Sequence, residues 1–270
     1  MFVVLNLFIS DSRDDPKQVW SYYCTSFESA GVKMQRSTVG RLAGKRALVT
    51  QSDEYMGPAI GKRFREEGAE VIESLGSYEA DPALPARIVA DAGRIDILVV
   101  NLRSRPSAAT SGTGLAKRAF AQDEDEESWQ LMFDRLVHPT RRFIAAVLPQ
   151  MIARQSGKII AVTSAVPLRA IPGTSTYAAA RAAQNTYVRV VGAEVAKYNV
   201  QVNAIAQNFV KGGFDPDAMN DPAIRELVMS QVPARRLSEE EEQAELALFL
   251  ASDASNFFVG QVVPYAGGWV

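Results

Sequence analysis

The feature that most constrains the fold is an alternation of short apolar runs with amphipathic helical stretches from Lys45 onward. This alternation is typical of βαβ units, in which helices cover both faces of a parallel sheet. Apolar runs rich in β-branched residues predict strands at residues 46–50, 70–73, 95–100, 158–163, 200–206 and 262–265. The predicted fold class is therefore α/β, with a doubly wound parallel sheet.

Helical periodicity fills the segments between these strands. It predicts helices at residues 58–67, 82–92, 126–154, 175–197, 222–232 and 238–251. Ser175, Asp221 and Ser238 precede helix-forming residues and are predicted N-caps, with Glu241 completing a capping box at Ser238. Strands and helices in this order predict a Rossmann-like fold in a single domain.

Two segments do not fit the repeating units. Residues 1–40 are predicted to be an N-terminal extension, either an extra helix or a partly disordered segment, and residues 41–270 form the Rossmann-like catalytic domain. Residues 104–125 contain Gly112 and Gly114 and read as a long loop. That loop could be a mobile rim of the active site or a plain surface insertion.

Charge and composition exclude several functions. The formal net charge is -2, so the chain lacks the basic surface that binds nucleic acid. Cys24 is the single cysteine and His138 the single histidine, so we expect no disulfide within the chain and no metal site. The apolar N-terminus lacks a basic segment before it and a cleavage site after it. We expect a soluble, cytoplasmic protein with no membrane partner.

The residues that carry chemistry are Ser164, Tyr177 and Arg181. Ser164 follows a predicted strand, and a residue at the carboxyl end of a parallel strand faces the ligand crevice of such folds. Tyr177 and Arg181 are four residues apart on a predicted helix and so share one face. A free tyrosine has a pKa of about 10, and a guanidinium held close favours the phenolate. We therefore predict Tyr177 as the base, tuned by Arg181, with Ser164 holding the substrate oxygen.

A serine at a strand end followed thirteen residues later by Tyr-x-x-x-Arg resembles the halohydrin dehalogenases. They are relatives of the short-chain dehydrogenase/reductases, which carry lysine in place of that arginine. The resemblance extends from about Gly40 to Trp269. It implies an α/β fold like that of the short-chain dehydrogenases, a Ser-Tyr-Arg triad and a homotetramer.

The dinucleotide site of the dehydrogenases is altered in this chain. Their turn TGxxxGxG corresponds here to TQSDEYMG, which puts Gln51 and Tyr55 where two glycines let the backbone approach a pyrophosphate. Leu75 stands where an acid commonly binds the ribose, although Glu73 lies two residues earlier. Leu102 and Arg103 replace a small pair of residues after the third strand. We therefore expect no nicotinamide cofactor.

The resemblance also implies a halide pocket in place of the cofactor. In the family, the loop after the fifth strand binds the halide through backbone N–H groups, and aromatic side chains complete the pocket. Backbone N–H groups of this kind can form an anion-binding nest. Carried over to this sequence, the loop is Gln207, Asn208, Phe209 and Val210, and the aromatic residue of the former glycine turn is Tyr55.

The predicted function is the conversion of vicinal haloalcohols to epoxides and halide without a cofactor. The family resemblance implies the reverse reaction as well, ring opening by azide, cyanide or nitrite. Two alternatives stay open: an NAD(P)-dependent short-chain dehydrogenase/reductase with an atypical glycine loop, and a non-catalytic scaffold that binds a small molecule.

Overall fold

The computed structural model describes residues 40–104, 120–211 and 220–270. Within them, six strands form one parallel sheet in the order β2-β1-β3-β4-β5-β6. The strands are β1 (Arg46–Thr50), β2 (Glu70–Ser74), β3 (Ile97–Asn101), β4 (Gly157–Ser164), β5 (Val200–Gln207) and β6 (Val262–Tyr265). The predicted α/β fold class and all six strands are confirmed. The predicted extension, up to residue 39, and residues 105–119 of the predicted loop lie outside the described residues.

Helices pack on both faces of this sheet. They are α2 (Gly57–Glu66), α3 (Leu84–Ala92), α4 (Glu126–Met132), α5 (His138–Ala153), α6 (Ser175–Val195), α7 (Pro222–Gln231) and α8 (Glu240–Ala251). Single 3-10 turns lie at Ala121–Asp123, Val166–Leu168, Ala196–Tyr198 and Asp253–Ser255, and a π-helical turn, η3, at Phe133–Val137.

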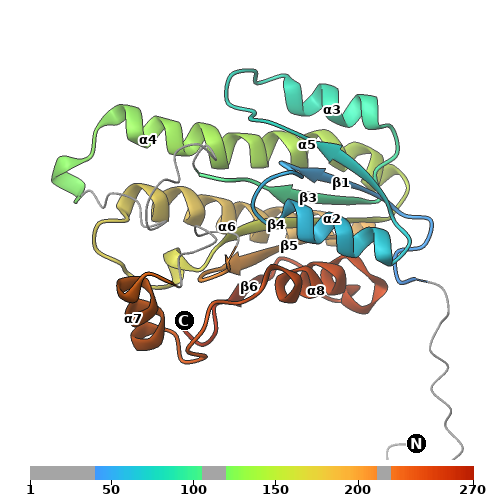
Figure 1. Cartoon of the computed structure of the whole chain (residues 1–270). Coiled ribbons are helices and arrows are strands. Elements are labelled where there is room, and N and C mark those ends of the chain that lie inside the picture. The colour runs from blue at the N-terminus through green and yellow to red at the C-terminus, as the bar shows by residue number, and fades with distance from the viewer. Residues whose placement is uncertain (1–39, 105–119, 212–219) are drawn as a thin grey trace, which may run out of the picture. The chain divides into compact units, whose positions relative to one another are not determined.

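The two faces of the sheet have separate apolar cores. On one face, residues of α2 and α8 pack against the strands, and on the other face residues of α3, α5 and α6 do so (Figure 1). Every residue of β3, β4 and β5 is buried, which explains why these strands read as nearly continuous apolar runs.

The chain reverses its winding direction between β1 and β3. It passes from β1 to β2 on one side and then returns to place β3 on the other side of β1. Ligands of open α/β sheets bind at the carboxyl ends of the strands around such a switch point. Here the two strand ends are joined, because the Thr50 hydroxyl donates to Asn101 O and accepts from Asn101 N, both at 2.9 Å.

The long helix predicted at residues 126–154 is wrong as a single element. It is divided into α4, η3 and α5. Pro139 at the start of α5 has no N–H to donate, and its ring would clash with the carbonyl four residues earlier in a regular helix. The π turn removes this conflict by changing the hydrogen-bond register just before the proline.

The capping box of α8 lies one residue later than predicted. Glu239 is the N-cap and its N–H donates to Glu242 at 2.9 Å. Ser238 is instead paired as in a strand, since its N–H donates to Phe209 O at 2.9 Å and its carbonyl accepts from Lys211 N at 3.1 Å. The cap predicted at Asp221 is confirmed, because its carboxylate accepts from Ala223 N at 2.8 Å.

Among the described residues, no helix is both long enough and apolar enough to cross a bilayer.

Candidate active site

Tyr177 and Arg181 are in direct contact at the start of α6. Arg181 Nε donates to the Tyr177 hydroxyl at 3.2 Å, and its guanidinium carbon lies 5.4 Å from the centre of the tyrosine ring. Arg181 is buried, with 1% of its surface exposed, whereas Tyr177 is half-buried. The predicted helical spacing therefore places a cation on a phenol that solvent can reach.

Ser164 is the last residue of β4 and is buried. Its hydroxyl accepts from Val166 N at 3.1 Å, and its carbonyl accepts from Asn185 Nδ2 at 3.2 Å. Arg181 donates to Val162 O of the same strand at 3.2 Å. Side chains of α6 thus fix the helix against the end of β4, although the described contacts include no hydrogen bond between Ser164 and Tyr177.

The Arg181 guanidinium is held by neutral groups. Besides Tyr177 and Val162 O, it donates to Leu102 O at 3.1 Å and to Gln184 Oε1 at 3.0 Å. Across the described ranges, no carboxylate lies within ion-pair distance of it. Its positive charge is therefore solvated by dipoles and is not neutralised.

The turn after β1 keeps the backbone shape of a glycine turn without two of its glycines. Gln51 and Tyr55 have φ angles of 43° and 56°, in the left-handed region, which costs a residue with a side chain about 1–2 kcal/mol. Asn101 Nδ2 holds the turn by donating to Gln51 O and Glu54 O, both at 2.9 Å. Gly57 remains because a Cβ there would lie 2.5 Å from Gln51 O.

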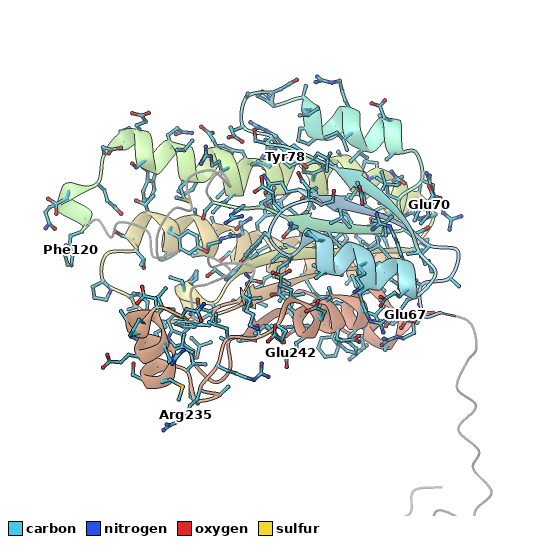
Figure 2. All side chains as sticks on the ribbon, viewed as in Figure 1. Glu67, Glu70, Tyr78, Phe120, Arg235 and Glu242 are labelled. Atoms are coloured by element: carbon cyan, nitrogen blue, oxygen red, sulfur yellow. The ribbon has the colours of Figure 1, made fainter. Side chains whose placement is uncertain are left out.

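The backbone N–H and the side-chain oxygen of Gln51 already have partners within the protein. Its N–H donates to the Tyr78 hydroxyl at 3.1 Å, and its Oε1 accepts from Arg103 N at 2.7 Å. The Tyr78 hydroxyl is also 2.8 Å from Ser74 Oγ. Tyr78, which is labelled in Figure 2, is buried. Its ring lies edge-on to that of Phe143 of α5, with ring centres 4.9 Å apart.

Tyr55 of this turn interacts electrostatically with Tyr177. Burial raises the pKa of Tyr55, the nearby Tyr177 raises it further, and the Arg181 and Arg103 guanidiniums lower it. Tyr55 is therefore protonated at neutral pH and can donate a hydrogen bond next to the tyrosine–arginine pair.

These residues do not fit a nicotinamide dinucleotide, the cofactor that the fold suggests. A pyrophosphate needs glycine at the turn so that the backbone can come close, and here Gln51 and Tyr55 carry side chains. The Gln51 N–H is engaged by Tyr78, and Leu102 is completely buried in the core.

The loop after β5 differs in part from the predicted anion nest. Asn208 N donates to Tyr265 O at 3.0 Å, so this backbone N–H is already engaged within the sheet and is not a free donor of the predicted nest. The cause is that the pairing of β5 with β6 continues one residue past the strand end. Phe209, with a φ of 57°, packs edge-on against Trp269 at 5.7 Å, and Val210 is buried.

Gln207, the last residue of β5, lies beside the predicted triad because it pairs with Ser164 in the sheet. It is the cross-strand partner of Ser164, so the two side chains project to the same face. Gln207 is buried, and its Oε1 has no hydrogen-bond partner among the described residues. The Gln207 oxygen is thus a candidate acceptor for a substrate hydroxyl, and the Nε2 of the same amide is a candidate donor to an anion.

Sequence reasoning missed Glu124 and Gln184. Glu124 Oε1 accepts from the Ser175 hydroxyl at 2.8 Å and from Thr176 N at 3.0 Å, and these bonds lower its pKa. It therefore stabilises the first turn of α6, where Thr174 and not the predicted Ser175 is the N-cap. A capping partner 51 residues away in sequence gives no local signal.

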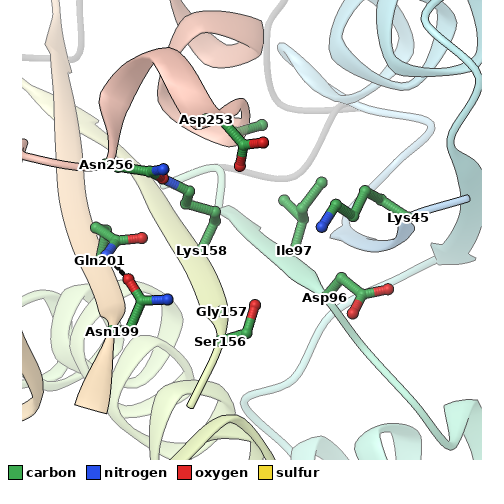
Figure 3. A pocket seen from close by; sticks show the side chains of 11 residues that line it. Lys45, Asp96, Ile97, Ser156, Gly157, Lys158, Asn199, Gln201, Asp253 and Asn256 are labelled. Atoms are coloured by element: carbon green, nitrogen blue, oxygen red, sulfur yellow. Dashed lines mark hydrogen bonds between the residues drawn. The ribbon is translucent and has the colours of Figure 1, made fainter. Parts of the chain in front are cut away.

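A cavity lies at the opposite end of the strands, where β4 begins (Figure 3). Lys158 lines it and donates to Ser255 Oγ at 3.2 Å and Asn256 Oδ1 at 2.7 Å. Burial lowers the pKa of Lys158 to about 8. The charged lining consists of two lysines and two aspartates, Lys45, Lys158, Asp96 and Asp253, so its formal charges balance. Ser164 is at the other end of β4, and this cavity is therefore not the candidate active site.

In the part of the chain that the structure describes, no three or more His, Cys, Asp or Glu side chains are grouped as they would be to hold a metal ion.

The doubly wound parallel sheet and the tyrosine–arginine pair beside a strand-end serine define a Rossmann-type α/β protein with an enzyme-like site. A family model described as enoyl-(acyl carrier protein) reductase matches residues 75–270. The chain belongs to this family of short-chain dehydrogenases/reductases.

This chain matches curated relatives over nearly their whole length. The 3-oxoacyl-(acyl-carrier-protein) reductase FabG of Chlamydia trachomatis is 30% identical over 246 residues, with 85% of this chain and 98% of the relative covered. The 2,5-dichloro-2,5-cyclohexadiene-1,4-diol dehydrogenase LinX of Sphingobium indicum is 31% identical over 251 residues, with 85% and 97% covered.

Solved structures show the same fold with different activities in their titles. One titled "Dehalogenation enzyme" has a TM-score of 0.75 and 28% identity, with 85% of this chain and 99% of that chain covered. A gluconate 5-dehydrogenase of Burkholderia cenocepacia in complex with NADP and tartrate has a TM-score of 0.73 and 25% identity, with 85% and 96% covered.

Proposed function

We propose that the chain is a halohydrin dehalogenase that converts vicinal haloalcohols to epoxides and halide without a nucleotide cofactor. The observation that carries the proposal is the place of Tyr55. Its phenol comes from the turn that in dehydrogenases approaches a pyrophosphate, and it interacts electrostatically with Tyr177 and Arg181. The solved structure titled "Dehalogenation enzyme" supports the same assignment.

In this reaction Tyr177 removes the hydroxyl proton of the haloalcohol. The substrate oxygen then forms a bond to the neighbouring carbon, and the carbon–halogen bond breaks, so that halide leaves with the bonding electrons. Arg181 donates to the Tyr177 oxygen and so stabilises negative charge on it. Ser164 donates a hydrogen bond from its hydroxyl to the substrate oxygen, because that hydroxyl uses only its acceptor side toward Val166.

The halide would leave toward the loop after β5. The Gln207 side-chain amide, the Val210 N–H and the Tyr55 hydroxyl are the proposed donors there, and the side chain of Phe209 would contribute apolar surface. Neutral donors stabilise the charge that develops on the halide without holding it as tightly as a full positive charge would. In the reverse direction, azide, cyanide or nitrite would enter through the same place.

The experiment is an assay of the purified full chain with a panel of small and bulky vicinal bromo-alcohols and no added nucleotide. Bromide is measured by ion chromatography and proton release by pH-stat. Tyr177→Phe should remove bromide release, while Tyr187→Phe, on the same helix, is the matched control that should retain it. Bromide release that is absent from the wild type with every substrate contradicts the proposal.

The named relatives favour a second candidate, an NAD(P)-dependent reductase. Titration with NADH and NADPH, followed by quenching of tryptophan fluorescence, separates the two. Saturable binding together with reduction of a carbonyl substrate would establish the reductase. A protein inactive in both assays that retains a small molecule through purification would instead be a binding scaffold.

A further inference from the structure

The buried guanidinium of Arg181 is the starting point. A charge removed from water costs several kcal/mol unless other groups solvate it. Its four acceptors, Tyr177 Oη, Val162 O, Leu102 O and Gln184 Oε1, are all neutral. The fold thus solvates this cation with dipoles and leaves it without a counterion in the described ranges.

Gln184 is the single side chain among these acceptors besides Tyr177, and it is completely buried. Its Nε2 donates to Leu136 O of η3 at 3.1 Å and to Thr140 Oγ1 at 2.7 Å. Both groups can only accept from it, because the Thr140 hydroxyl donates to Leu136 O at 2.6 Å. The amide orientation is therefore determined, and Oε1 must face Arg181.

We propose that Gln184 is a positioning residue that fixes the Arg181 guanidinium as a neutral acceptor, so that its uncompensated charge acts on the Tyr177 oxygen. A glutamate at the same place would keep an acceptor for Arg181 and would neutralise it, but it would lose the donor to Leu136 O. An amide at this position therefore orients the Arg181 guanidinium without neutralising its positive charge. The role rests on the proposed function, in which the Tyr177 phenolate is the base.

Other charged and titratable groups lie around the site. Tyr55 and Arg103 interact electrostatically within it. Four carboxylates around the site have partners of their own: Glu54 with Arg103, Glu79 with Arg135, Glu124 with Ser175 and Thr176, and Asp134 with Gln130 and His138. None of these four carboxylates forms an ion pair with Arg181. A carboxylate at position 184 would, because Gln184 Oε1 already accepts from the guanidinium.

The test compares Gln184→Glu and Gln184→Met in the full chain. Glutamate keeps an acceptor for Arg181 and adds charge; the Thr140 hydroxyl can turn to donate to it, and Leu136 O then loses both of its donors. Methionine keeps the volume and removes the acceptor. The phenolate of Tyr177 is measured without substrate, as the ultraviolet absorbance difference between each protein and its Tyr177→Phe counterpart across a pH series.

In Gln184→Glu, we expect the Tyr177 phenolate to appear at a pH higher by at least about one unit, since a neutralised cation stabilises it less. In Gln184→Met we expect the phenolate at the wild-type pH or below, with kcat for bromide release reduced because Arg181 is less well fixed. The rising limb of the pH–rate profile should move only in Gln184→Glu.

A phenolate difference spectrum that is unmoved or moved to lower pH in folded Gln184→Glu would overturn the proposal, as would an equal upward shift in both variants. If Gln184→Glu does not fold, an upward shift in Gln184→Met alone overturns it and an unmoved or lower one supports it. Because the absorbance arm needs no substrate, its result stands even when no haloalcohol is turned over, which would count only against the dehalogenase assignment.

Discussion

Arg181 contacts Tyr177 twice, since its Nε donates to the phenol oxygen at 3.2 Å while its guanidinium carbon lies 5.4 Å from the ring centre. The two residues are one helical turn apart, so the contact requires no movement of the backbone. A guanidinium fixed by three further acceptors cannot turn away from the phenol when the charge on the oxygen changes.

Substitution of this pair should separate proton transfer from positioning. Tyr177→Phe removes the proposed base, and we expect bromide release to fall about 10²–10⁴-fold. Arg181→Lys keeps the charge but cannot reach all four acceptors, so we expect a smaller loss of kcat and a loss of about 1–3 kcal/mol in the free energy of unfolding. Initial-rate kinetics and urea unfolding measure both. Equal rates for Tyr177→Phe and the wild type would contradict the proposed role.

Gly57→Ala should destabilise the protein strongly. The new Cβ would lie 2.5 Å from Gln51 O and 2.7 Å from Ser52 C, and backbone atoms cannot move away as a flexible side chain would. We expect a loss of at least about 2 kcal/mol, measured by urea unfolding. Gly44→Ala is the control, because its φ is +72° but no atom lies within 4 Å of the new Cβ. A larger loss in the control would mean that backbone strain outweighs the clash.

Lys158 should make stability depend on pH. Burial lowers its pKa in the folded state to about 8, from an ordinary value of 10.5. Between these values the unfolded chain retains a proton that the folded chain has released, so the free energy of unfolding rises with pH. We expect the stability of the wild type, relative to Lys158→Met, to increase from pH 8 to pH 10.5. Urea unfolding across this range tests it, with the exposed Lys62→Met as the control that should show no such trend.

Glu124→Ala should loosen the start of α6 next to Tyr177. The substitution removes the acceptor of the Ser175 hydroxyl and of Thr176 N. We expect faster hydrogen exchange at the Thr176 amide and a lower kcat for bromide release, with the free energy of unfolding reduced by about 1 kcal/mol. Glu124→Gln, which retains an acceptor oxygen, should restore most of the kcat and of the free energy of unfolding. Unchanged exchange at Thr176 in Glu124→Ala would argue against this capping role.

Local patterns in the sequence were sufficient to predict the sheet. Strand bounds such as Arg46–Thr50 and Val262–Tyr265 agree with the structure, because apolar β-branched runs between turn residues carry their own signal. The same holds for the pairing of Tyr177 with Arg181, which needs only helical spacing. The π turn at Phe133–Val137 was missed because a proline within an apolar helical pattern does not reveal how the helix adjusts to it.

Contacts between distant segments could not be predicted. The pairing of Asn208 N with Tyr265 O depends on how far β6 extends beside β5, and the hydrogen bonds of Gln184 depend on the carbonyl that η3 exposes. The hydrogen bond from Gln51 N to the Tyr78 hydroxyl likewise joins residues from two different loops. Each of these is a property of the assembled sheet and helices, and no run of adjacent residues encodes it.

The left-handed backbone at Gln51 and Tyr55 has a consequence for how this fold changes its chemistry. The main chain of the turn already has the dihedral angles that glycine would adopt, and Asn101 holds it in that form. Placing glycine at the two positions would alter side chains alone and leave the path of the chain as it is. A scaffold of this kind can gain or lose room for a phosphate group by point substitution, so closely related sequences can diverge in reaction type while their backbones stay superimposable.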